Sequence, residues 1–110
     1  MIKEIKAIIR PERLSAVLQA LHQMPRLPGV TVSHVRGFGR RVPADPDGEA
    51  FDAVDMAKLE IVIATELVND VVHTIERAAH TGRAGDGKIF MVPVEGAVRV
   101  RSGERDVLAL

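Results

Sequence analysis

The chain has 110 residues, the length of one folded domain, which leaves no room for a second domain. Lys plus Arg and Asp plus Glu both number 15, so no net charge draws the protein toward nucleic acid or an anionic membrane. The lack of cysteine excludes disulfides and thiolate chemistry and fits a cytoplasmic protein, while three Phe and no Trp or Tyr argue against a stacking surface for single-stranded nucleic acid.

The first predicted elements are a strand and a helix. Residues 2–9 alternate in the short branched pattern of a strand, and no apolar run long enough for a signal peptide or a membrane span follows Met1. Pro11 suits the first turn of a helix, where a missing N–H costs nothing, and apolar residues at helical spacing extend this helix to Met24. The Pro- and Gly-containing stretch 25–29 ends it.

A second strand and a long loop follow. Residues 30–38 alternate again, whereas residues 39–55 lose all periodicity and collect two prolines and five acidic side chains. Because structureless loops of this length are often functional in compact domains, we interpret 39–55 as an interaction arm. A passive insertion is the alternative.

The second half of the chain repeats the pattern of strand, helix and strand. Residues 58–64 predict a third strand, and Thr65 is expected to cap a helix with Glu66 in its first turn and a core face reaching Ala79. A glycine-rich connection over 81–87 leads to a fourth strand over 88–93. Residues 98–101 suggest a short edge strand.

This order predicts an α+β fold, the ferredoxin-like βαββαβ sandwich with two helices on one face of an antiparallel sheet. Residues 59–63 and 89–92 are apolar on both faces, although two helices can cover only one. We therefore expect the other face to meet further copies of the chain in a homo-oligomer.

The glycine-rich connection is the first candidate site. From Gly82 to Lys88 it superficially fits a phosphate loop, but Ile89 replaces the Ser or Thr that binds magnesium, and a strand follows instead of a helix. Glycines such as Gly85 and Gly87 still let main-chain N–H groups approach an anion, and Lys88 adds a charge. A plain turn between helix and strand is the alternative.

Two weaker candidates lie elsewhere. Arg99 and Arg101 project from one face of the predicted last strand and would repel each other unless an anion or neighbouring carboxylates lay between them. Gly37, Gly39 and Arg40 close the second strand, either as part of an anion site or only as a bend.

No catalytic centre or metal centre is predicted. The sequence offers no Ser-His-Asp order, paired buried carboxylates or metal triad that can be placed on rigid elements, and its four histidines lack ligand spacing. We therefore expect a protein that is not an enzyme and that has no metal site.

These motifs, in this order, resemble the PII signal-transduction family. The resemblance covers nearly the whole chain as one PII-like domain, 1–110, and its glycine-rich segment is the most specific part. It implies a homotrimer of ferredoxin-like subunits with ATP, ADP or AMP in each cleft between neighbours. The long loop 39–55 corresponds to the family's T-loop, which docks on a target protein such as a membrane transporter or a metabolic enzyme. The segments that carry the resemblance are residues 5–11, 37–40, 58–62, 81–90 and 99–104.

Carried over by position, the resemblance implies a nucleotide site in which several cations surround one polyphosphate. Its residues are Thr31, Gly37, Gly39, Arg40, Gly85, Gly87, Lys88, Arg99 and Arg101.

Two departures from the family pattern bear on the second ligand. Arg41 stands where nitrogen-sensing members keep a glutamine that ligates Mg²⁺ and positions 2-oxoglutarate, and Met56 stands where they keep a lysine for that acid. A cation beside the metal position disfavours Mg²⁺, and Met cannot pair with a carboxylate. We therefore expect no ordinary 2-oxoglutarate response and leave the role of Mg²⁺ open. Arg41 becomes the candidate second-effector residue, with bicarbonate as its ligand.

The alternative is a structural trimer, or a metal-tolerance protein of the same fold, without nucleotide sensing. Such a protein would show no stabilisation by nucleotide.

Overall fold

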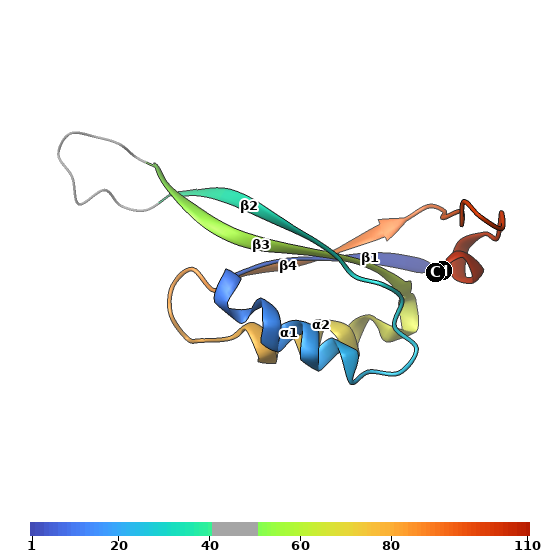
Figure 1. Ribbon diagram of the computed structural model, residues 1–110, viewed down its shortest axis with the longest axis horizontal. Helices are drawn as coiled ribbons and strands as arrows, with labels where there is room; N and C mark the ends of the chain where they lie inside the picture. The colour runs from blue at the N-terminus through green and yellow to red at the C-terminus, as the bar shows by residue number, and fades with distance from the viewer. Residues whose placement is uncertain (41–50) are drawn as a thin grey trace.

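The computed structural model describes residues 1–40 and 51–110 and shows two layers, a sheet over a pair of helices (Figure 1). Neighbouring strands are all antiparallel in the order β2-β3-β1-β4, which confirms the predicted ferredoxin-like α+β fold. No helix in these residues is long and apolar enough to cross a membrane. The elements are β1 (Ile2–Ile9), α1 (Leu14–His22), β2 (Thr31–Arg40), β3 (Phe51–Ala64), α2 (Val68–Ala79) and β4 (Gly87–Val94), with 3-10 turns at Pro11–Arg13, Thr65–Leu67 and Asp106–Ala109.

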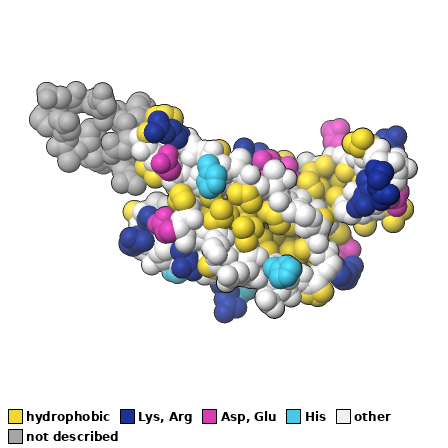
Figure 2. Space-filling model, in the orientation of Figure 1, with side chains coloured by type: hydrophobic (Ala, Val, Ile, Leu, Met, Phe, Trp, Pro, Cys, Tyr) yellow, Lys and Arg dark blue, Asp and Glu magenta, His cyan; other side chains and the backbone are white. Residues whose placement is uncertain are grey.

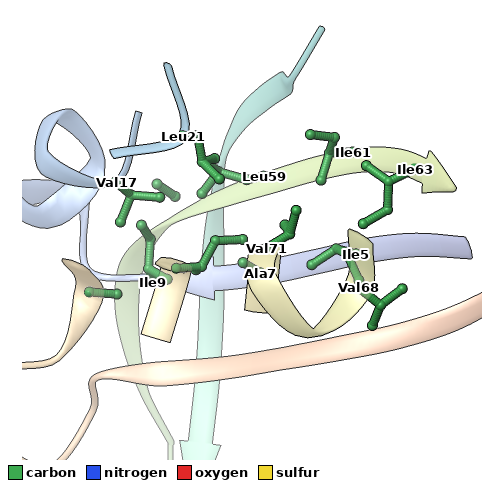
Figure 3. Packing of buried hydrophobic residues seen from close by; sticks show 13 residues of the cluster. Ile5, Ala7, Ile9, Val17, Leu21, Leu59, Ile61, Ile63, Val68 and Val71 are labelled. Atoms are coloured by element: carbon green, nitrogen blue, oxygen red, sulfur yellow. The ribbon is translucent and has the colours of Figure 1, made fainter. Parts of the chain in front are cut away.

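The core lies between the two central strands and the helices (Figure 3). Every second residue from Ile5 to Ile9 in β1 and from Ala57 to Ile63 in β3 is buried on the helix side, because successive side chains of a strand point to opposite faces. Each buried Val, Leu or Ile side chain stabilises the fold by about 1.5–3 kcal/mol relative to exposure, and each buried Ala by less. The strand residues are Ile5, Ala7, Ile9, Ala57, Leu59, Ile61 and Ile63, and the helices contribute Val17, Leu21, Val68, Val71, Ile75 and Ala79.

Both helices differ from prediction at their ends. The predicted helix 11–24 begins with a 3-10 turn at Pro11 and is α-helical only to His22. Thr65 does not cap α2: its Oγ1 is buried without a hydrogen-bond partner among the described residues. Instead the Thr65 N–H donates to the Met1 carbonyl, 3.1 Å away, so the end of β3 is tied to the start of the chain.

The strands around the predicted interaction arm are longer than expected. β2 continues to Arg40 and β3 begins at Phe51, so residues 39–40 and 51–55 are paired strand and not loop. Antiparallel pairing with β2 outweighs the weak strand preference of the Ala and Asp residues at the start of β3. Residues 41–50, the remainder of the predicted arm, lie outside the described residues.

The predicted edge strand over 98–101 is wrong. A single bridge joins Val98 to Arg105, and the chain between them turns back on itself at Gly103, whose φ is 76°. The Gly103 N–H donates to the Arg99 carbonyl at 2.8 Å, which closes this turn. The segment after β4 therefore bonds mainly to itself.

The sheet face away from the helices is open and carries charged and apolar side chains in register. Lys6 lies between Glu60 of β3 and Phe90 of β4, and it pairs with Glu4 at 3.5 Å. Phe90 and Val92 are 46% and 39% exposed, although they belong to a strand inside a folded domain. This open face has the mixed apolar and ion-paired character that suits a protein contact.

Candidate functional site

The glycine-rich connection between α2 and β4 folds around one carboxylate. Asp86 accepts hydrogen bonds from the Thr81 N–H at 2.8 Å, from the Thr81 hydroxyl and from the Gly82 N–H at 2.9 Å. The Arg10 Nε, from the end of β1, donates to Asp86 at 2.9 Å, and His80 Nδ1 lies 3.9 Å away. A carboxylate shared by several donors holds a short loop in one conformation.

The ionisation of Asp86 follows from these contacts. The Thr81 hydroxyl, then the Thr81 N–H and then Arg10 lower the pKa of Asp86 far below its usual value, because all of them stabilise the charged carboxylate. The loop is therefore built on an ionised aspartate. Sequence reasoning missed both Asp86 and Arg10. An aspartate five residues after a threonine, within a glycine-rich turn, is the local signal that points to Asp86.

The glycines of the loop have conformational roles of their own. Gly85 and Gly87 have φ values of 93° and 107°, a region that favours glycine. A Cβ on Gly87 would lie 1.8 Å from the Ile8 carbonyl oxygen, so glycine at this position is required by the approach of β4 to β1. Whether Gly85 and Gly87 also approach phosphates stays a prediction.

Lys88 lies on the open face of the sheet at the start of β4. The register aligns Lys88 with Ile8 of β1, Lys58 of β3 and Ser33 of β2, so two lysines flank one isoleucine. Lys58 pairs with Glu60 at 3.6 Å, whereas Lys88 is exposed and makes no ion pair or hydrogen bond among the described residues. Lys88 is therefore a cation available to a ligand.

The predicted residues of β2 lie along the opposite edge of the sheet. Gly37 and Gly39 pair with Val54 and Asp52 beyond the end of β1, where the β2–β3 pair extends as a two-stranded ribbon (Figure 1). The ribbon and the glycine-rich loop lie at the same end of the sheet. The side chain of Arg40 and all of Arg41 lie outside the described residues.

Thr31 of β2 and Met56 of β3 are two further residues of this edge that the sequence analysis singled out. Thr31 is exposed and pairs with Glu60 near the middle of the sheet, away from the ribbon. Met56 is only 9% exposed, and its Cγ would lie 3.8 Å from a Cβ placed on Gly37. The side chain next to Gly37 is therefore the uncharged thioether of Met56.

The predicted pair of arginines lies at the other end of the molecule. Arg99 and Arg101 follow the end of β4 that pairs with Ile2, whereas Gly87, at the other end of β4, pairs with Ile9. Arg99 donates from Nη2 to the Leu110 main-chain oxygen at 2.6 Å and from Nε to the Ala109 oxygen at 3.3 Å. Because residues 98–101 do not form a strand, the prediction that Arg99 and Arg101 project from one face of a strand is wrong.

Figure 2 shows Lys and Arg side chains near both ends of the long axis and also along the lower edge of the molecule, with a mainly apolar area in the middle of this face. One chain does not bring Arg99 and Arg101 together with Lys88. No group of three or more metal-ligating side chains occurs among residues 1–40 and 51–110.

A groove of about 340 Å³ lies beside the loop, between α2 and β4. Apolar residues such as Val72 and Ile89 line it, but so do the acidic Glu76 and Asp86. The basic residues His80 and Lys88 line the groove as well, so Lys88 borders both this groove and the open face of the sheet.

Comparison with known proteins shows the family to which this chain is similar. A sequence model described as "Nitrogen regulatory protein P-II" matches residues 2–104. A nitrogen regulatory protein P-II of Azospirillum brasilense is 43% identical over 94% of this chain and 95% of its own length, and that of Rhizobium meliloti is 40% identical over 98% and 99%. The crystal structure of Arabidopsis thaliana PII bound to citrate matches with a TM-score of 0.83 and 42% identity over 99% of this chain and 92% of its own.

Proposed function

This chain belongs to the nitrogen regulatory protein P-II family of signal-transduction regulators, and from that premise we propose that it is a homotrimeric cytoplasmic protein that responds to ATP, ADP or AMP. It would act by binding a target protein, a membrane transporter or a metabolic enzyme, through residues 39–55. It would carry out no catalysis of its own.

The main support for this proposal is that the cationic side chains expected to bind the phosphates lie at opposite ends of one chain. Lys88 and the glycine-rich loop lie at one end of the sheet, and Arg99 and Arg101 lie at the other. A polyphosphate that needs cations from both groups has to lie between two copies of the chain. The nucleotide site then forms only on assembly, so ligand binding and the arrangement of subunits are coupled.

The open face of the sheet is the surface that we propose for this assembly. Phe90 and Val92 are exposed there beside the Lys6–Glu4 pair. Burying this face between copies would remove apolar area from water, at about 25 cal/mol per Å². Three copies around one axis would each cover the others' open face.

The second ligand is proposed from the departures at Arg41 and Met56. A buried thioether beneath Gly37 offers no charge to a carboxylate, which supports the absence of an ordinary 2-oxoglutarate response. We propose bicarbonate, held by Arg41 against a nucleotide phosphate, as the ligand to test first. The same titrations decide whether Mg²⁺ accompanies the nucleotide.

Calorimetric titration tests nucleotide binding directly. ATP, ADP and AMP are each added to the purified protein with and without Mg²⁺, 2-oxoglutarate and bicarbonate. Lys88→Ala is expected to weaken ATP binding by about 1.5–3 kcal/mol, the value of a charge-assisted hydrogen bond. Arg77→Ala, which removes an exposed cation from the last turn of α2, is the matched control and should leave affinity unchanged.

Two outcomes would count against the proposal. Equal ATP affinity in Lys88→Ala and the unaltered protein would place the nucleotide elsewhere. A trimer that binds no nucleotide under any condition would support the scaffold or metal-tolerance alternative.

A further inference from the structure

The carboxylate of Asp86 faces into the glycine-rich loop and not toward a ligand. Its Oδ2 accepts from the N–H groups of Thr81 and Gly82, and its Oδ1 accepts from the Thr81 hydroxyl and Arg10 Nε. The Asp86 side chain is 23% exposed and that of Arg10 is 20% exposed. Both groups form the inner side of the loop.

Arg10 also fixes a peptide plane on the outer side. Its Nη2 donates to the Ala84 carbonyl oxygen at 2.6 Å. In a planar trans peptide the carbonyl oxygen and the following N–H point in opposite directions, so the Gly85 N–H is directed away from Arg10. Gly85 is exposed, and no hydrogen bond among the described residues engages its N–H.

We infer that Arg10 and Asp86 are positioning residues that hold the Gly85 N–H outward as a donor to a phosphate group of the nucleotide, without touching the nucleotide themselves. This inference rests on the proposed function. On the inner side of the loop, the ion pair of Arg10 and Asp86 fixes the loop conformation. On the outer side, the Gly85 N–H donates to the anion, and Lys88 follows three residues later in the chain.

Replacing Asp86 separates positioning from simple electrostatics, because the two predict opposite signs. Removing a negative charge beside a polyphosphate should strengthen ATP binding if only charge matters. Asp86→Asn instead puts an NH₂ group where one of the two oxygens accepts, so the loop loses its fixed conformation. We expect ATP affinity to fall about 10-fold to 100-fold, the range of one charge-assisted hydrogen bond, while adenosine, which has no phosphate, keeps its affinity.

Arg10→Ala provides a second variant, and Arg13→Ala is its matched control. Arg13 belongs to the same segment but donates from Nε and Nη2 to the Ala78 carbonyl, at 2.9 and 2.6 Å, and not to the loop. Removing Arg10 should lower the ratio of ATP affinity to adenosine affinity, whereas removing Arg13 should leave that ratio unchanged. Binding is measured by calorimetry at a temperature where thermal unfolding shows every variant to be folded.

A spectroscopic measurement reports on the donor itself. In ¹⁵N-labelled protein the Gly85 amide resonance should shift on addition of ATP and not on addition of adenosine, and the shift should be lost in Arg10→Ala.

The outcomes distinguish this inference from the proposed function. An unaltered protein that binds no nucleotide would overturn both. Tight ATP binding by the unaltered protein, with equal or tighter binding by Asp86→Asn, would overturn the positioning role alone. If Asp86→Asn does not fold, the comparison of Arg10→Ala with Arg13→Ala decides, and equal affinity ratios in these two variants would reject the inference.

Discussion

Gly87 shows how one residue can be required by the fold at a position that also suits a ligand. A Cβ there would lie 1.8 Å from the Ile8 carbonyl oxygen, and the φ of 107° is unfavourable for other residues. Gly87→Ala should therefore push β4 away from β1 and lower the free energy of unfolding by about 3 kcal/mol or more, the combined cost of overpacking and backbone strain.

Chemical denaturation measures this loss, and Gly37→Ala is the control. No atom of the described residues approaches a Cβ on Gly37 more closely than 3.8 Å, so the control should change stability by less than about 1 kcal/mol. Similar losses in the two variants would mean that the approach of β4 to β1 does not determine the residue at position 87.

The residues of the loop also show what the sequence could predict. A pattern of glycines followed by lysine indicated the location of the candidate site, because glycine spacing is local. The partnership of Arg10 with Asp86 was not predictable, since the two residues lie 76 positions apart and meet only when β4 pairs with β1. Local patterns thus locate a candidate site, and long-range pairing determines its inner contacts.

At the scale of elements, the strongly periodic segments were predicted well and their ends were not. The alternation that predicted a strand over 58–64 reflects burial on β3, but the strand begins at Phe51, because pairing with β2 continues beyond the buried part of the sheet. The edge strand over 98–101 failed for the opposite reason. Within residues 1–40 and 51–110 its alternating residues pair with no other strand and form only the Val98–Arg105 bridge.

The start of α2 gives a prediction at the same scale. The Thr65 hydroxyl was expected to cap the helix, but it is buried without a partner among the described residues. Thr65→Val removes an unsatisfied polar atom and keeps the branched shape, so it should raise the free energy of unfolding by about 1 kcal/mol. Thr65→Ser, which keeps the hydroxyl and loses the methyl group, should lower it.

Thermal and chemical unfolding of the two Thr65 variants provide the check. A loss of stability in Thr65→Val would show that the hydroxyl has a hydrogen-bond partner in solution, for example in a neighbouring copy of the chain.

At the scale of the whole molecule, the apolar character of residues 59–63 and 89–92 on both faces predicts a sheet surface that the helices leave uncovered. The two helices cover one face of the sheet, and the other remains open with Phe90 and Val92 exposed. The spatial division of the site was less accessible to prediction. The sheet register places Lys88 beside Ile8, near one end of β1, whereas Arg99 follows Val94, which pairs with Ile2 at the other end. The spacing of these cations in the sequence does not reveal that one chain keeps them apart.

The role of the open face can be tested with two neighbouring residues of β4. Phe90 is on the open face and Met91 is on the helix side, yet they are similarly exposed, at 46% and 51%. Phe90→Asp would bury a carboxylate in the proposed interface, so sedimentation velocity should detect monomers in place of trimers. Met91→Asp should leave the trimer intact, which separates the effect of the face from that of the added charge.

The same pair of variants links assembly to ligand binding. If Arg99 and Arg101 reach the phosphates from a neighbouring copy, Phe90→Asp should weaken ATP binding by at least about 1.5–3 kcal/mol, the value of one charge-assisted hydrogen bond. Met91→Asp should bind ATP normally. Monomers of Phe90→Asp with unchanged ATP affinity would mean that one chain holds a complete site, and Arg99 and Arg101 would then lose their proposed role.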